Sequence, residues 1–450
     1  MAVIIGADNG TISGSGGLKL AGDSSGIVQL TSGANITALT LDASQNATFA
    51  GKVASAGSLQ LATNGTTTAL TLDASQNATF AGSVNIPGGS GSINAINTFG
   101  FKNRIINGAM MIDQRNAGAS VTPTTSNTYC IDRWTNYISQ ASKYSVQQNA
   151  GSVTPPAGFS KYLGVTSLSA YSILSTDYFL LIQNIEGYNI ADLGWGTANA
   201  KTVTLSFQVY SSLTGTFGGS LKGASGTVYS YPFTYSIPTA NTWTTISITI
   251  AGPTAGTWTS DNTTGIQVCL GLGAGSSFSG TAGAWVNNGN AYSATGATSV
   301  VGTNGATFYI TGVQLEKGST ATSFDYRPYG TELNLCQRYC YTLGGAFNGS
   351  PSWNQYCTGA LTSSTQFSGT MQIPVTMRAS PSFSYSASSL SNFWVVSASA
   401  ATNPTAIALN QASPTAFNIT ATVSGHTAGQ AGVFYQNSGL ATQLQLTAEL

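Results

Sequence analysis

Hydrophobic and polar residues alternate along most of this 450-residue chain, and a period of two predicts β-strands. The alternation is clearest in the segment ALTLDASQNATFAG, which occurs at residues 38–51 and again at 69–82. In each copy two leucines share one face, the polar stretch DASQN has the composition of a turn, and an alanine and a phenylalanine then share a face. Each copy is therefore predicted to form a short β-hairpin.

These hairpins have few apolar side chains to bury, and an isolated two-stranded hairpin is marginally stable in water. Repeated units of this kind persist when neighbouring copies or other chains cover their apolar faces. We therefore expect residues 1–95 to form an oligomeric β-stem and not an independent globule. A Gly/Ser-rich stretch, Pro87–Ser92, closes the stem as a linker.

The next region, residues 100–330, reads as strands separated by Gly, Pro and Asn clusters. The predicted strands are Ile105–Ile112, Tyr144–Gln148, Tyr178–Ile185, Thr202–Tyr210, Thr244–Ile250, Ile266–Leu272 and Thr307–Leu315. Seven or eight strands over this length indicate a two-sheet β-sandwich.

One helix is predicted, at residues 331–341, with Thr331 as its cap and Glu332 near its positive end. We interpret this helix as a connector to a further β-sandwich, the head, at residues 342–450. The predicted head strands are Phe367–Ile373, Ser382–Ala387, Phe393–Ser397, Ala416–Val423 and Leu440–Glu449.

Charged residues make up 6% of the chain and the formal net charge is +0, so the basic footprint of a nucleic-acid-binding protein is absent. In residues 342–450 only Arg378 and Glu449 carry a formal charge, and packing against sister chains would protect so neutral a β-domain from uncontrolled edge association. No apolar run has the length of a membrane span, and residues 1–30 lack the features of a signal peptide.

No cofactor or metal is expected. The five cysteines have no metal-type pairing and are interpreted as buried free thiols. The oxygen-donor side chains considered for calcium are Asp113, Glu316 and Asp325, and each is expected to pair with a nearby arginine instead.

Several segments together resemble the central domain of phage tail-fibre and receptor-binding proteins. They are NRIINGAMMIDQRNAG at 103–118, YCIDRW at 129–134, FYITGVQLEKG at 308–318, FDYRPYG at 324–330 and LCQRY at 335–339. The stem repeat is similar to the LDxxGNATFxG elements of tail-fibre shafts. The resemblance implies an all-β protein with a trimeric stem of hairpin repeats, a jelly-roll-like sandwich related to carbohydrate-binding modules, and a distal β-sandwich head.

The resemblance further implies a homotrimer located in the virion and assembled in the host cytoplasm. Its N-terminus would dock to other tail or baseplate proteins, and its distal domains would contact the bacterial surface. The expected function is adsorption to the host through a cell-surface glycan.

Glycan binding uses aromatic rings that stack on sugar C–H faces, and amides or hydroxyls that bond to sugar hydroxyls. Aromatic and amide residues in loop-like contexts are the candidates for this role. They are Trp195, Trp258, Trp285 and Tyr292 in the sandwich, and Trp353, Tyr356, Tyr435, Gln436 and Asn437 in the head.

Two alternatives remain open: a structural virion or baseplate fibre with no host contact, and a tailspike-like glycan depolymerase. A glycosidase needs two carboxylates at a defined separation. Asp177, Glu186 and Asp192 are close in sequence, but solvated or capping roles are expected for them. His426 has no nucleophile motif beside it, so an enzyme is not expected.

Overall fold

The computed structural model describes residues 28–32, 36–41, 47–49, 59–63, 67–72, 78–80, 101–344, 346–347, 350–351, 355–385, 390–436 and 443–450. The chain divides into two compact units, Met1–Asn94 and Ala95–Leu450. The described residues form many strands and a single α-helix, so the prediction of an all-β protein is confirmed.

In the first unit, each copy of the repeated sequence contributes to a three-stranded antiparallel sheet. The strands are β1 (Val28–Ser32), β2 (Ile36–Leu41), β3 (Ala47–Phe49), β4 (Leu59–Thr63), β5 (Thr67–Leu72) and β6 (Ala78–Phe80). Leu39 lies opposite Phe49 in one sheet and Leu70 opposite Phe80 in the other, so identical sequences adopt identical pairing. The expected turn at 42–46 and the linker at 87–92 lie outside the described residues.

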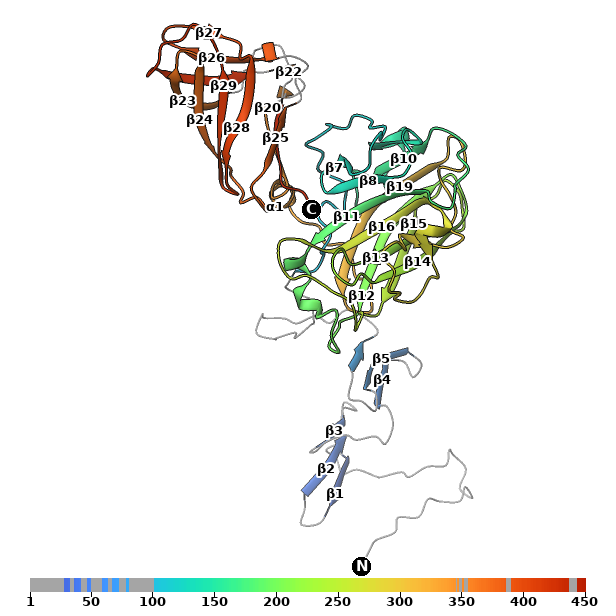
Figure 1. Cartoon of the computed structure of the whole chain (residues 1–450). Helices are drawn as coiled ribbons and strands as arrows, with labels where there is room; N and C mark the ends of the chain where they lie inside the picture. Colours follow the sequence, from blue (N-terminus) through green and yellow to red (C-terminus); the bar gives the residue numbers. More distant parts are fainter. Residues whose placement is uncertain are drawn as a thin grey trace, which may run out of the picture. The chain divides into compact units, whose positions relative to one another are not determined.

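Residues 101–328 of the second unit, hereafter the sandwich, fold as two packed antiparallel sheets (Figure 1). In spatial order, the five-stranded sheet contains β15 (Thr244–Ile250), β12 (Val203–Ser211), β19 (Thr307–Lys317), β10 (Leu163–Ser167) and β9 (Tyr144–Gln148). The six-stranded sheet contains β14 (Ser230–Ile237), β13 (Gly215–Lys222), β16 (Thr264–Ala274), β11 (Tyr178–Glu186), β8 (Trp134–Ile138) and β7 (Thr128–Ile131). A short parallel pair, β17 (Ser279–Gly280) and β18 (Ser293–Ala294), completes this region.

The core of the sandwich consists of the alternate residues that the two sheets direct toward each other. Phe179 and Leu181 of β11 face this core with Leu205 and Phe207 of β12, and Trp134 of β8 is fully buried beside them. This packing confirms the prediction of a two-sheet sandwich.

The predicted strand Ile105–Ile112 is wrong, because this segment is a loop held by side chains. Asn107 and Met110 have positive φ angles of 59° and 57°, which interrupt an extended backbone. The Asn107 carboxamide accepts a hydrogen bond from Ile112 N–H at 2.9 Å and donates one to Ile112 O at 2.8 Å. Side-chain bonds thus replace a strand ladder. Every other predicted strand of the sandwich overlaps an observed one.

The single described α-helix, α1, spans Tyr329–Gln337, so the predicted bounds 331–341 are wrong at both ends. Its N-cap is Pro328 and no side chain caps it, so Thr331 does not have the expected role. No described helix has both the length and the apolar character of a membrane-spanning segment. Short 3₁₀ turns are η1 (Ala150–Ser152), η2 (Gly187–Asn189), η3 (Ala191–Leu193), η4 (Ser276–Phe278) and η5 (Leu390–Asn392).

Residues 340–450, hereafter the head, form a second sandwich with its own core. Its larger sheet contains, in spatial order, β27 (Ala401–Thr402), β26 (Phe393–Ser397), β30 (Ala431–Gln436), β23 (Gln355–Ser363), β24 (Gln366–Gln372), β29 (Ala416–Thr422) and β28 (Ala406–Ala412). The smaller sheet contains β20 (Cys340–Gly344), β31 (Gln443–Thr447) and β25 (Ser382–Tyr385), and β21 (Ala346–Phe347) pairs with β22 (Ser350–Pro351). Leu444 and Leu446 of β31 pack with Phe367 and Phe434 of the larger sheet.

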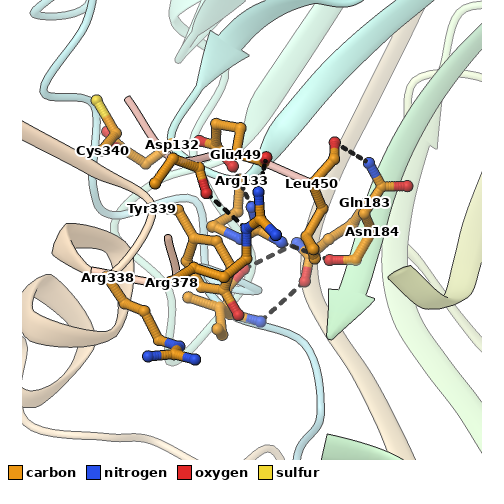
Figure 2. A network of polar contacts seen from close by, with 12 residues as sticks. Asp132, Arg133, Gln183, Asn184, Arg338, Tyr339, Cys340, Arg378, Glu449 and Leu450 are labelled. Carbon is orange, nitrogen blue, oxygen red and sulfur yellow. Dashed lines mark hydrogen bonds and ion pairs between the residues drawn. The ribbon is translucent and has the colours of Figure 1, made fainter. Parts of the chain in front are cut away.

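A buried network of charged side chains joins the head to the sandwich (Figure 2). Arg115 donates to the Glu449 carboxylate at 2.6 Å, and Arg133 forms an ion pair with the other carboxylate oxygen. The Arg133 guanidinium also lies 3.6 Å from the centre of the Tyr339 ring. Arg378 donates to the backbone oxygens of Ala448 and Glu449, both at 2.7 Å, and to that of Asn262 at 2.9 Å. The two formal charges of residues 342–450 therefore both lie at this junction.

Candidate functional site

The structure brings together three of the predicted glycan-binding residues, Trp195, Trp258 and Trp285. Their ring centres lie 4.8, 5.4 and 5.5 Å apart, all in edge-to-face arrangements. Each indole N–H donates to a backbone carbonyl oxygen within the sandwich, at distances of 2.6 to 3.1 Å. Trp195 is 6% exposed in the sandwich core, whereas Trp258 and Trp285 are half-buried. The cluster therefore closes one part of the core and leaves only two partial ring surfaces for a ligand.

Three other predicted residues are buried, which corrects their assignment to direct glycan contact. Tyr292 is 8% exposed because it packs against Tyr137 and Phe278 on the outer side of the six-stranded sheet. Tyr356 is 6% exposed in the core of the head, and its hydroxyl lies 3.2 Å from the carboxamide oxygen of Gln436, which is fully buried.

Tyr435 is half-buried and lines an open groove of about 360 Å³ in the head, together with Gln355, Val396 and Val433. Its ring stacks on Trp394 with the centres 6.5 Å apart. The remaining candidates, Trp353 and Asn437, lie outside the described residues.

A better-formed site lies where the segments 103–111 and 324–332 meet, and we call it the aromatic concavity. It has a volume of about 200 Å³. Its lining residues are Asn103, Asn107, Gly108, Ala109, Met111, Gly158, Phe159, Ser160, Phe324, Asp325, Tyr326, Arg327, Tyr329 and Glu332.

Three aromatic rings form one wall of the concavity. The ring of Phe159 lies 5.1 Å from that of Phe324 and 5.5 Å from that of Tyr326, and the last two rings are 5.0 Å apart. Gly312 permits this packing, because it has a φ angle of +63° and a Cβ atom there would lie 2.6 Å from the Phe159 ring. Tyr326 is 57% exposed, so much of its surface remains open to solvent.

Arg327 organises the polar part of the concavity. It donates to the backbone oxygen of Ile105 at 3.1 Å and to that of Asn103, and it forms an ion pair with Glu332 at 3.2 Å. Glu332 also accepts the backbone N–H of Asn107. The guanidinium and this carboxylate are thus engaged with the protein itself and hold the two segments together.

Asp325 differs from these two groups because its side chain is 32% exposed. Its nearest ionic partner is Arg327 Nε, at 3.7 Å, and no donor among the described residues lies within hydrogen-bond distance of its carboxylate oxygens. Its own backbone N–H donates to Gln314 Oε1 at 2.9 Å, which fixes the position of the residue. The concavity therefore combines exposed aromatic surface with an accessible acceptor group.

Sequence reasoning did not select Phe159, Phe324 or Tyr326 as binding residues. In the sequence, the segment FDYRPYG supports the family resemblance and contains Asp325, a candidate calcium ligand. Aromatic and charged residues mixed in one loop are also a signal for a binding surface. Asp325 pairs with an arginine as expected, but Asp113 and Glu316 do not. Asp113 accepts backbone N–H groups at 2.7 and 2.9 Å, and Glu316 accepts the backbone N–H of Thr322 and the side-chain amide of Gln314. Among the described residues no group of three potential metal ligands occurs.

The carboxylates considered for hydrolysis are each engaged separately. Asp177 accepts the hydroxyls of Ser139 and Tyr171 at 2.9 and 2.8 Å. Glu186 accepts Arg338 Nε at 2.9 Å in the junction with the head, and Asp192 pairs with Arg104 at 2.7 Å. The expected solvated or capping roles fit Asp177, which also accepts the Leu174 N–H at 2.8 Å, and the half-exposed Asp192, whereas Glu186 is 2% exposed and serves in a buried ion pair.

His426 lies between two hydroxyl groups of the head. Its Nδ1 atom is 2.9 Å from Ser397 Oγ and its Nε2 atom is 2.7 Å from Thr402 Oγ1. Burial lowers the pKa of its imidazole. These contacts hold the ring in place between two strands of the head.

No protein-family model matches the sequence, and no curated protein matches it. Among solved structures, the chain is similar to the enzymatically active domain of tailspike protein 4 of bacteriophage CBA120, with 13% identity and a TM-score of 0.28 over 48% of this chain and 21% of that one. It is also similar to a putative sugar binding protein from Bacteroides thetaiotaomicron VPI-5482, with 13% identity and a TM-score of 0.28 over 48% of this chain and 100% of that one.

A third similar structure is the family 11 carbohydrate-binding module of Lic26A-Cel5E from Clostridium thermocellum, with 14% identity and a TM-score of 0.23 over 45% of this chain and 98% of that one. The aligned part spans about a fifth of the length of the tailspike domain. Because these similarities are distant, the function must be inferred from the residues of this chain.

Proposed function

We propose that this chain is a phage tail-fibre protein that mediates adsorption to a bacterial host by binding a cell-surface glycan in the aromatic concavity. The observation that carries the proposal is the exposed Tyr326 ring beside the open carboxylate of Asp325. The tail-fibre assignment rests on the resemblance of the segments at 103–118, 308–318 and 324–330.

Sugar rings have apolar C–H faces and a rim of hydroxyl groups, so they bind where an aromatic face lies next to polar groups. The concavity has both features, and its volume of about 200 Å³ suits a single sugar residue. Pockets that enclose a drug-sized ligand are larger, at about 300–1,000 Å³. The affinity of one site is therefore low.

Multivalency turns low single-site affinity into firm adsorption. The stem offers a route to this multivalency, because each three-stranded sheet has few apolar side chains and needs sister chains to cover them. We propose a homotrimer in the virion, assembled in the host cytoplasm, with the N-terminal stem attached to tail or baseplate proteins. The chain acts by binding and does not cleave the glycan.

Substitution Tyr326→Ala tests the proposed site, with Tyr188→Ala as a matched control. Both tyrosines belong to the second unit and are similarly exposed, at 57% and 62%, but Tyr188 does not line the concavity. Binding of the full-length chain to an array of bacterial surface oligosaccharides should fall at least about tenfold for Tyr326→Ala, because stacking on the exposed ring is lost. The control should bind like the wild type.

Equal binding by both variants would place the glycan elsewhere. Absence of binding by the wild type to every glycan would favour a fibre without host contact. Release of soluble oligosaccharide from host polysaccharide during the incubation would favour a depolymerase.

A further inference from the structure

The charge that a ligand meets in the aromatic concavity comes from one residue. Three charged residues line it, but the side chains of Arg327 and Glu332 are 13% and 14% exposed, against 32% for Asp325. Arg327 is directed at two backbone oxygens and at Glu332, and its Nε atom lies on the Asp325 side at 3.7 Å, so its guanidinium is turned toward the protein. The site therefore presents a negative, acceptor-only group beside its aromatic wall.

We propose that Asp325 makes the concavity selective for uncharged sugars with neighbouring hydroxyl groups, and against sugars that bear carboxylates. This inference rests on the proposed glycan site and names its substrate class. An ionised carboxylate has two oxygens that only accept hydrogen bonds, so it can bind two adjacent hydroxyl donors at once. A uronic-acid carboxylate cannot donate, and it adds a second negative charge within a space of about 200 Å³.

The backbone around Asp325 supports a fixed acceptor. Its N–H donates to Gln314 Oε1 at 2.9 Å, and Gln314 is fully buried in β19, where its amide also donates to Glu316 at 2.9 Å. The neighbouring residues Phe324 and Tyr326 pack their rings together with Phe159. Asp325 lies between two residues of the aromatic wall in the sequence and lines the same concavity. A sugar stacked on Tyr326 therefore has its hydroxyl groups close to the Asp325 carboxylate.

The test uses the full-length chain and two sets of probes: tetrasaccharides of glucose, galactose and mannose, and the same tetrasaccharides oxidised to carboxylates at C6. The dissociation constants are measured by isothermal titration at low and at high salt. At least one neutral probe should bind about tenfold more tightly than its oxidised form, because a hydrogen bond to a charged group is lost and like charges repel. High salt should narrow the difference, since it screens the repulsion.

The variant Asp325→Asn keeps the shape of the side chain and removes its charge. It should weaken binding of the neutral probe about tenfold and bring the neutral and oxidised probes within about threefold of each other. The control Asp261→Asn removes the same charge from a carboxylate outside the concavity, so the dissociation constants of the neutral and the oxidised probes should stay as in the wild type. Unfolding curves matching the wild type establish that both variants are folded.

Tighter binding of an oxidised probe by the wild type, or unchanged discrimination in Asp325→Asn, would overturn the inference and leave the proposed glycan site intact. Absence of binding by the wild type to all six probes would overturn the inference together with the site. A preference of the wild type for neutral probes that is lost in Asp325→Asn supports both the inference and the proposed glycan site.

Discussion

Replacement of Glu449 by glutamine should strongly destabilise the junction between the sandwich and the head. The Glu449 carboxylate is shared by Arg115 and Arg133, and the three side chains are 7%, 10% and 1% exposed. Glutamine has nearly the same shape, so the substitution removes the charge while the packing stays the same. It leaves two buried guanidinium groups without this counter-charge.

The expected cost follows from the burial of the pair. Loss of one partner of a buried ion pair costs about 3–5 kcal/mol, because the remaining charge stays out of water. Arg133 keeps its contact with the Tyr339 ring, which is worth about 0.5–2 kcal/mol, and its bond to the Asn184 carbonyl. We therefore expect Glu449→Gln to lower the free energy of unfolding by about 3 kcal/mol.

Differential scanning calorimetry of the full-length chain, combined with amide hydrogen exchange, measures the effect. Exchange should increase first at β31 and at the Arg133 turn, and the transition of the head should separate from that of the sandwich. The control is Lys317→Met, whose ion pair with Asp192 at 3.2 Å is half-exposed and should be worth at most about 1 kcal/mol.

A loss smaller than about 1 kcal/mol in Glu449→Gln would refute the reasoning that buried charge holds the two sandwiches together. The triple variant Arg115→Met, Arg133→Met and Glu449→Leu provides a second check. It removes all three charges of the network at once, so it should be less destabilising than Glu449→Leu alone, which leaves both guanidinium groups buried without a counter-charge.

Three further predictions concern the titration, backbone and assembly of the chain. Burial raises the pKa of Asp132 to about 6 from its ordinary value of 3.8, so the folded chain binds a proton at this carboxyl group more tightly than the unfolded chain does. The free energy of unfolding should therefore fall as the pH rises from about 4 to about 6. Urea titrations across this range should show that Asp132→Asn loses this dependence. Gly108→Ala would place a Cβ atom 2.2 Å from the Val313 backbone oxygen, so it should lower the free energy of unfolding in urea by more than about 2 kcal/mol. The control Gly425→Ala has open space around it and a φ angle of +77°, so it should lower the free energy of unfolding by about 1 kcal/mol. The full-length chain should have three times the mass of one chain in mass photometry, and deletion of residues 1–94 should reduce this mass to that of a smaller assembly.

Local alternation predicted several strands to the residue, namely Tyr144–Gln148, Thr244–Ile250 and Phe393–Ser397. In the first two strands the apolar side chains pack on a core and most of the polar ones face outward, so the pattern is visible along the chain. The strand Phe393–Ser397 is a short apolar run of which Phe393 and Val395 face the core. The strand β13, Gly215–Lys222, was not predicted because three of its residues are glycines, which are poor strand formers. Its conformation comes from pairing with β14 and β16, where a Cβ atom at Gly219 would lie 2.4 Å from the Cys269 oxygen.

The amino-acid sequence by itself determined the all-β class, the repeated unit and the scarcity of charge, because these depend on composition and on neighbouring residues. Only the tertiary structure decided which polar and aromatic residues meet a ligand. The rings of Phe159 and Tyr326 are in contact although most of the sandwich sequence separates the two residues. Tyr356 is buried although its local sequence has the polar character of a loop. Burial and contact of this kind depend on how distant strands pack, and no local pattern contains that information.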